Sequence, residues 1–293
     1  MLLSTTATVF VVIVTLEVAI IVTGNVFTIF VFWTQRLHFK RTFLLLINLA
    51  VADLLVGLGE ALILAANTIP NGGNEAEKNE SPWWAFQVFG SGTSLLFLVL
   101  ISLERVYSVL WPFRHRVTST RAYIYSIVIV WVTGVCMSAV SLLEIYHLIA
   151  NLNAAFTYAP VLFICLLFIC TSYLMIRLRL QSTGPISDFQ HQTLKEKSLR
   201  MSRTVFIVVA VSLVFWFPAF VMITTRDFCS CFSPLAVWFV IVLQLGNSMV
   251  NPFVYSFRMP IFQDALKRCW RKRRQNIELR PLPRKSHHAE CDL

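Results

Sequence analysis

The stretch "NSMVNPFVYSFR", Asn247 to Arg258, closes the last long apolar segment of the chain. Within two helical turns it carries Asn247, Ser248 and Asn251, followed directly by Pro252. Polar groups at membrane depth are costly and therefore usually mark a site or a pathway. A proline at that depth is tolerated only where neighbours satisfy the backbone carbonyl that it leaves without a partner. The stretch therefore predicts a membrane-crossing helix that faces other helices with a polar cluster.

The composition of the whole chain places it in a membrane. The chain of 293 residues is 57% hydrophobic, and its mean hydropathy is +0.68. Its apolar residues form blocks long enough to cross a bilayer, which needs about 20 residues per helix. The fold class we expect is an all-α membrane protein, a seven-transmembrane helix bundle that occupies residues 1–257. The expected spans are 9–33, 43–66, 83–110, 123–143, 154–176, 201–224 and 234–257.

The basic residues predict the orientation. All Lys and Arg except Lys78 and Arg226 follow the first, third, fifth or seventh span, or flank them on the same side. The positive-inside rule then places the N-terminus outside and the C-terminus in the cytoplasm. The first span exceeds a signal-peptide core and precedes a basic loop, so we expect a retained helix of a multi-pass plasma-membrane protein. The net charge of +10 then indicates contact with anionic membrane lipid and gives no support for nucleic acid.

A few polar residues lie inside the expected spans. Asp53 and Ser94 join Asn247, Ser248 and Asn251 as side chains that lipid would turn toward the bundle. Their oxygen atoms suit a hard, weakly held ion such as Na⁺ together with water, with Asp53 and Ser94 as its ligands. The alternative is a structural hydrogen-bond network worth about 1 kcal/mol per contact. The residue types alone favour that structural network.

Several motifs occur in order, each within the expected span. They are Gly24-Asn25, the run from Asn48 to Asp53 (NLAVAD), Glu104-Arg105-Val106, Pro112-Phe113, Trp131, Trp216-Phe217-Pro218, Asn251-Pro252 with Tyr255, and Phe262. Together they resemble the rhodopsin-like (class A) G protein-coupled receptors, over residues 23 to 270. The resemblance implies a receptor without enzymatic activity that binds an extracellular ligand and activates a heterotrimeric G protein by conformational change.

The resemblance also assigns roles to the polar residues. It implies that Asp53 and the four residues grouped with it form a collapsible sodium and water pocket, and it implies no other cofactor. With the resemblance, we favour this pocket over the structural hydrogen-bond network. At the cytoplasmic end, an arginine cannot lose its charge and must pair or meet water, which makes Glu104 the resting partner of Arg105. On activation, the resemblance implies that Arg105 is released toward Tyr255 and a Gα subunit, and that Phe113 inserts into the same subunit. The alternative for Arg105 is that its side chain only reaches out to the lipid headgroups. The resemblance also assigns switch positions to Trp216, Pro218 and Pro252.

A ligand pocket is expected in the outer half of the bundle. Helical spacing puts Glu60 on the Asp53 face, and Gln87 stands where amine receptors carry an aspartate, which argues against an amine bound in their manner. Two carboxylates favour a ligand with a cationic or hydrogen-bond-donating group; the alternative is protonated acids bonded to neighbouring helices, and lipid ligands stay open. The expected lining residues are Glu17, Glu60, Gln87, Ser91, Trp216, Phe220 and Gln244.

Some positions depart from the family pattern. Val106 replaces a tyrosine, Glu80 stands where a disulfide cysteine is common, Ser212 replaces a phenylalanine, and the helix-five proline position falls on either Pro160 or Cys165. With a short second outer loop, these departures resemble the melanocortin branch and its cannabinoid, lysophospholipid and adenosine relatives.

Other segments carry weaker patterns. Residues 258–274 predict a basic amphipathic helix on the inner leaflet, with Cys269 either palmitoylated or an unmodified thiol. Residues 275–293 have the composition of a disordered tail. Asn79 begins a glycosylation sequon, and Cys229 and Cys231 either pair or stay free.

Two other function classes, a transporter and a membrane enzyme, find less support in the sequence. A proton- or ion-coupled transporter could use the buried acid Asp53, but such proteins carry inverted repeats and paired broken helices. The sequence has neither. It also has no metal-spaced histidine or cysteine cluster and no nucleophile motif of a membrane enzyme.

Overall fold

The computed structural model describes residues 2–36, 41–68, 82–148, 154–182, 210–225 and 232–258, with residues 262–264, 266–268 and 271 beyond them. All regular structure in these residues is helical. The long helices are α1 (Leu2–Thr34), α2 (Arg41–Thr68), α4 (Trp83–Leu110), α6 (Thr120–Ile145), α7 (Ala154–Ser182) and α9 (Pro234–Arg258).

Six of the described helices are long and apolar enough to cross a membrane, and Ala210–Thr225 is a shorter apolar helix. They coincide with the expected spans to within a few residues, except that α1 begins at Leu2 and α7 continues to Ser182. The expected span 201–224 is described only from Ala210 onward. The helical class predicted from the sequence is therefore confirmed.

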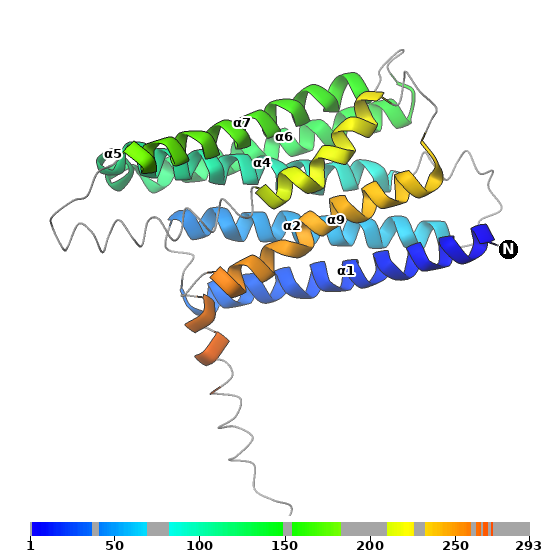
Figure 1. Cartoon of the computed structure of the whole chain (residues 1–293), viewed down its shortest axis with the longest axis horizontal. Helices are drawn as coiled ribbons and strands as arrows, with labels where there is room; N and C mark the ends of the chain where they lie inside the picture. Colours follow the sequence, from blue (N-terminus) through cyan, green and yellow to red (C-terminus); the bar gives the residue numbers. More distant parts are fainter. Residues whose placement is uncertain are drawn as a thin grey trace, which may run out of the picture.

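The helix α4 occupies the middle of the bundle. It packs against α2, α6 and α7, while α1 packs against α2 and α9, as Figure 1 shows. Large apolar side chains such as Leu16, Trp33, Ile129 and Phe163 are exposed on the outer faces. Extended exposed apolar surface of this kind marks contact with a membrane or a partner, and on helices of this length it is the face turned to lipid.

Two glycines allow helices to approach closely. A Cβ added at Gly90 of α4 would lie 2.9 Å from the backbone nitrogen of Val56 in α2. A Cβ added at Gly24 of α1 would lie 3.1 Å from Cγ of Pro252 in α9. Small residues at such crossings let backbones pack directly, which is a main source of helix association in lipid.

The carbonyl freed by Pro252 has a partner on another helix. Because proline lacks an N–H, the carbonyl of Ser248, four residues earlier, cannot form its usual helical bond. Asn25 Nδ2 of α1 donates to that Ser248 oxygen at 3.3 Å and to the Ile21 oxygen at 3.0 Å. Pro252 is therefore tolerated because Asn25, more than 200 positions earlier in the chain, bonds to the carbonyl that the proline leaves free.

Replacing Asn25 with alanine should leave the Ser248 carbonyl unpaired in an apolar bundle. We expect a loss of about 1–2 kcal/mol in the free energy of unfolding, measured as a lower thermal unfolding midpoint in detergent. Thr23→Ala is the matched control, because Thr23 is exposed and donates only within its own helix, to the carbonyls of Ala19 and Ile20. Equal midpoints for the two variants would contradict the role of Asn25.

Candidate functional site

Asp53 lies fully buried where three helices meet. Its Oδ1 accepts hydrogen bonds from Ser94 Oγ of α4 at 2.6 Å and from Ser248 Oγ of α9 at 2.7 Å. Its Oδ2 accepts from Asn251 Nδ2 of α9 at 2.7 Å. The structure therefore brings together four of the five residues that the sequence grouped as an ion pocket.

The fifth residue of that group, Asn247, is also buried, and its Oδ1 has no hydrogen-bond partner among the described residues. A buried acceptor without a donor is costly and is the kind of atom that a cation or a water molecule would satisfy. The available ligands are carboxylate, hydroxyl and amide oxygens, which suit hard cations. Among the described residues, no group of three or more His, Cys, Asp or Glu could hold a metal ion. The oxygen atoms of this cluster are therefore of the kind that suits a hard cation.

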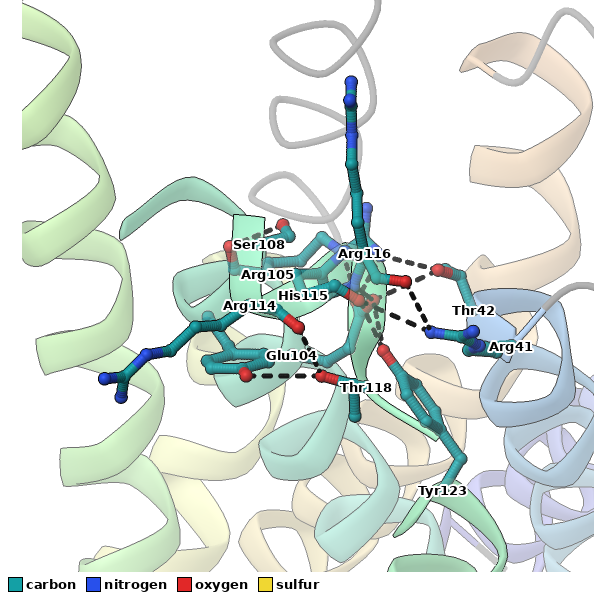
Figure 2. A network of polar contacts seen from close by, with 11 residues as sticks. Arg41, Thr42, Glu104, Arg105, Ser108, Arg114, His115, Arg116, Thr118 and Tyr123 are labelled. Carbon is teal, nitrogen blue, oxygen red and sulfur yellow. Dashed lines mark hydrogen bonds and ion pairs between the residues drawn. The ribbon is translucent and has the colours of Figure 1, made fainter. Parts of the chain in front are cut away.

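A second polar cluster lies near the C-terminal end of α4 (Figure 2). The guanidinium of Arg105 forms an ion pair with Oε2 of the preceding residue, Glu104, and both side chains are buried. Arg105 Nη2 also donates to Thr42 Oγ1 of α2 at 2.8 Å, and that hydroxyl donates to Glu104 Oε1 at 3.1 Å. The pair is thus held against α2 by Thr42. The sequence predicted that Glu104 pairs with Arg105, but it did not predict the contact with Thr42.

Two further residues complete this cluster, and the sequence analysis missed both. His115 Nε2 lies 2.9 Å from Glu104 Oε1, and Tyr123 OH of α6 donates to the same oxygen at 3.3 Å. His115 belongs to a short helix, α5 (Pro112–Val117), in the loop between α4 and α6. Pro112 at the first helical position could have revealed this helix, since proline is favoured there.

The remaining switch residues are less closely connected. Phe113 on α5 is 80% exposed, as a residue that docks on a partner should be. Tyr255 is buried, and its hydroxyl has no hydrogen-bond partner among the described residues, so it does not meet Arg105 here. Pro252 is buried against Gly24, and Pro218 lies half-buried in the helix Ala210–Thr225.

The residues expected to line a ligand pocket are mostly buried. Glu17, Glu60, Gln87, Ser91 and Trp216 are all more than nine-tenths buried. Ser91 Oγ donates to the Gln87 carbonyl of its own helix at 2.7 Å, whereas Glu17 Oε2, Gln87 Oε1 and Trp216 Nε1 have no partner among the described residues. The other two expected positions are Phe220, which stacks on Phe163 with ring centroids 6.0 Å apart, and the half-buried Gln244.

Several expected sites lie outside the described residues. These are Asn79, Cys229, Cys231 and Cys269, together with the tail from 275 to 293. Of the expected amphipathic helix, the structure describes Phe262, which is buried with its ring 5.7 Å from that of Phe32.

Comparison with known proteins decides the class. The sequence profile described as 7 transmembrane receptor (rhodopsin family) matches residues 24–255. The chain belongs to this family. The resemblance drawn from the motifs is confirmed, and the fold is a seven-helix bundle of a multi-pass membrane receptor that binds an extracellular ligand and couples to a G protein. The transporter alternative finds no support.

Curated relatives cover most of the receptor's length. Somatostatin receptor type 5 of Rattus norvegicus is 27% identical over 307 aligned positions, which cover 92% of this chain and 81% of the relative. Neuropeptide FF receptor 1 of Rattus norvegicus is 24% identical, covering 85% of this chain and 67% of the relative. Lysophosphatidic acid receptor 1-A of Xenopus laevis is 26% identical, covering 78% and 66%. These relatives are receptors and not enzymes; the melanocortin branch stays a prediction.

The two adjacent hydroxyl residues Thr93 and Ser94 allow a matched test of the Asp53 cluster. Ser94→Ala removes a donor to a buried carboxylate and should lower the free energy of unfolding by about 1.5–3 kcal/mol. Thr93 is equally buried, but its Oγ1 has no partner among the described residues, so the isosteric Thr93→Val should be neutral or stabilising. Thermal unfolding in detergent measures both, and a larger loss in Thr93→Val would refute the assignment.

Proposed function

We propose that the receptor signals by releasing Arg105 from Glu104, and that the Asp53 cluster sets how readily this happens. The observation that carries the proposal is the buried Glu104–Arg105 ion pair at the cytoplasmic end of α4. Arg105 stays charged at any physiological pH, so it can leave Glu104 only if another partner receives it. The C-terminal helix of a Gα subunit would offer backbone carbonyls at that place, and the activity is then nucleotide exchange on a heterotrimeric G protein.

The loop helix α5 supports this docking surface. It presents Phe113 and Val117, which are 80% and 82% exposed and one helical turn apart. Basic side chains of Arg114 and Arg116 flank them. An apolar pair surrounded by positive charge suits a partner that offers an apolar pocket with an acidic rim.

Sodium is the proposed regulator of the Asp53 cluster. With the ion bound, the hydroxyls of Ser94 and Ser248 would turn their lone pairs toward it, and Asn247 Oδ1 would gain a partner. A ligand that binds one arrangement of a cluster better shifts the population toward that arrangement. Sodium would therefore hold α2, α4 and α9 together and favour the resting state.

The extracellular ligand would bind above this cluster, among Glu17, Glu60, Gln87 and Trp216. The unpartnered oxygens Glu17 Oε2 and Gln87 Oε1 support a ligand that carries a cationic or hydrogen-bond-donating group, and Trp216 Nε1–H adds a donor for an acceptor on the same ligand. The distribution of basic residues supports an extracellular N-terminus and a plasma-membrane location.

Arg105→Ala should lower constitutive nucleotide exchange at least about tenfold, which corresponds to ~1.4 kcal/mol, because the side chain that Gα receives is gone. The assay uses purified protein in nanodiscs with a panel of purified heterotrimeric G proteins. Arg121→Ala, which removes an exposed charge at the start of α6, should leave exchange unchanged. Exchange that survives in Arg105→Ala at equal insertion would refute the switch.

Sodium should stabilise the wild-type fold by an amount that grows with the logarithm of its concentration above the dissociation constant. Ten times its dissociation constant would add about 1.4 kcal/mol to the free energy of unfolding, compared with choline chloride at the same ionic strength. Asp53→Asn keeps the shape but removes the charge, so its unfolding midpoint should respond equally to the two salts. An equal response in the wild type would mean that the five residues only hold the helices together.

Glu60→Gln and Glu17→Gln test the acidic pocket with the first agonist found in a ligand screen. Loss of the charge should weaken a cationic agonist by about tenfold or more, since hydrogen bonds to charged groups contribute about 1.5–3 kcal/mol. Potency is measured by G protein activation in cells at matched surface expression. Unchanged potency in both variants would remove the two acids from the ligand site.

A further inference from the structure

The link between α5 and α6 carries two adjacent hydroxyl residues whose surroundings differ. Thr118 Oγ1 donates to the Arg114 carbonyl at 2.8 Å and is hydrogen-bonded to Tyr107 OH at 3.2 Å. Ser119 is exposed, and its Oγ accepts one long hydrogen bond, from the Ala122 N–H at 3.4 Å. Among the described residues, the Ser119 hydroxyl donates to no acceptor. The Ser119 hydroxyl is therefore the accessible one of the two.

Three arginines flank this hydroxyl along the chain. Arg114 and Arg116 lie five and three residues before Ser119, and Arg121 lies two residues after it. All three are exposed, and in the part of the chain that the structure describes their guanidinium groups form no ion pair or hydrogen bond. Figure 2 shows the Arg114 and Arg116 side chains extending away from Glu104. Unpaired basic groups around an exposed serine form the charge pattern by which a kinase with an acidic substrate cleft selects its substrate.

We propose that Ser119 is a phosphorylation site for a basophilic serine/threonine kinase, and that its phosphate weakens docking of the G protein on α5. In the reaction, Ser119 Oγ attacks the γ-phosphorus of ATP and the bond from that phosphorus to the bridging oxygen breaks. The hydroxyl proton passes to the base of the kinase, and the products are phosphoserine and ADP. The modification requires only that this link faces the cytoplasm, as the basic residues predict, whereas the effect on docking rests on the proposed function.

The backbone around Ser119 suits both the kinase and the phosphate. Thr118, with φ −58° and ψ 132°, and Ser119, with φ −72° and ψ 150°, are extended between the two helices. The six residues of α5 are too few for a helix that is stable by itself, so α5 can open to lengthen the extended segment in a kinase cleft. Ser119 is the N-cap of α6, a position where negative charge is favourable. The phosphate is therefore compatible with the start of α6.

The phosphate changes the charge of the surface that α5 presents. Phosphoserine carries about −1.5 to −2 charges at pH 7, whereas Arg114 and Arg116 supply positive charge beside the exposed Phe113 and Val117. Phosphate oxygens form strong, charge-assisted hydrogen bonds with guanidinium groups. A phosphate on Ser119 thus offsets most of the positive charge that an acidic rim of the partner would meet, and it repels that rim. High salt should reduce the effect, because exposed charges are screened.

The first test needs no G protein. The purified full chain in nanodiscs is treated with ATP and with protein kinase A or protein kinase C as basophilic probes, or with a casein kinase as an acidophilic control. Mass spectrometry then assigns each phosphate to a residue, because the basic-flanked Ser202 and Ser286 lie outside the described residues. We expect a basophilic kinase to phosphorylate Ser119 and to leave Thr118 unmodified.

Two variants test whether the arginines select the site. Arg114→Gln combined with Arg116→Gln should slow phosphorylation of Ser119 at least about tenfold, since it removes the charges that the kinase cleft binds. Arg268→Gln, which removes an exposed arginine elsewhere in the chain, should leave the rate unchanged. An equal rate in the double variant would overturn the inference. So would an unmodified Ser119 with both basophilic kinases, when each phosphorylates a control peptide in the same mixture.

The second test compares nucleotide exchange by the kinase-treated receptor with exchange by the same sample after phosphatase treatment. Phosphorylation should lower wild-type exchange at least about threefold, because charge at an interface rim controls the rate of association. Ser119→Asn is the matched control, since asparagine is an equally good N-cap but accepts no phosphate, and kinase treatment should leave its exchange unchanged. An equal fall in Ser119→Asn would assign the effect to another site and overturn the inference. Absence of exchange by the unphosphorylated receptor with every G protein would instead refute the proposed function, and the mass spectra would still decide whether Ser119 is modified.

Discussion

A carboxylate in the middle of an apolar bundle has to be satisfied by protein alone, and the arrangement of the helices depends on how Asp53 is satisfied. Its two oxygens accept from Ser94 of α4 and from Ser248 and Asn251 of α9. Each donor comes from a helix that must lie at the right depth and rotation for the bond to form. Because water in the bilayer core cannot replace a missing donor, Asp53 fixes the register of α2 against α4 and α9.

Asn25 extends the same constraint to α1. It supplies a donor to the Ser248 carbonyl, which Pro252 leaves without a helical partner, while Ser248 uses its hydroxyl on Asp53. One residue of α9 thus connects α1 through its backbone and α2 through its side chain. The small Gly24 lets α1 approach Pro252 closely enough for this bond.

Asp53 and Glu104, two of the buried acids, are compensated in different ways. Asp53 is satisfied by neutral donors that could equally present lone pairs to an ion, whereas Glu104 is satisfied by Arg105 and His115, which compete for one carboxylate. Neutral hydrogen bonds keep the helices in register, whereas two basic side chains beside one carboxylate can replace each other as its partner. In the proposed function, the Asp53 cluster is therefore the ion-sensitive part of the receptor, and the Glu104–Arg105 pair near the C-terminal end of α4 is the part that is released.

Much of this was predictable from the sequence. Polar residues are costly in apolar helices, so the sequence alone predicted a cluster of Asp53, Ser94, Ser248 and Asn251. The pairing of Glu104 with Arg105 was predictable because the two residues are adjacent in the chain. The partner of the Ser248 carbonyl was not predictable, because Asn25 reaches it only through tertiary packing. Thr42, His115 and Tyr123 were missed, because polar residues at helix ends and in a basic loop look like ordinary solvated residues. The contribution of Thr42 and Tyr123 depends on how α2 and α6 pack against α4, and that of His115 on how α5 folds against α4. No periodicity of a six-residue helix indicates the second.

The central claim is that the Asp53 cluster and the Glu104–Arg105 pair belong to one conformational equilibrium. The most direct measurement is constitutive nucleotide exchange by the purified receptor in nanodiscs, titrated with sodium against choline at constant ionic strength. The account predicts a saturable fall in exchange with sodium, with a midpoint equal to the sodium dissociation constant obtained from the sodium dependence of the free energy of unfolding. Exchange that does not respond to sodium, although sodium stabilises the fold, would show that the two clusters act independently and would contradict the account.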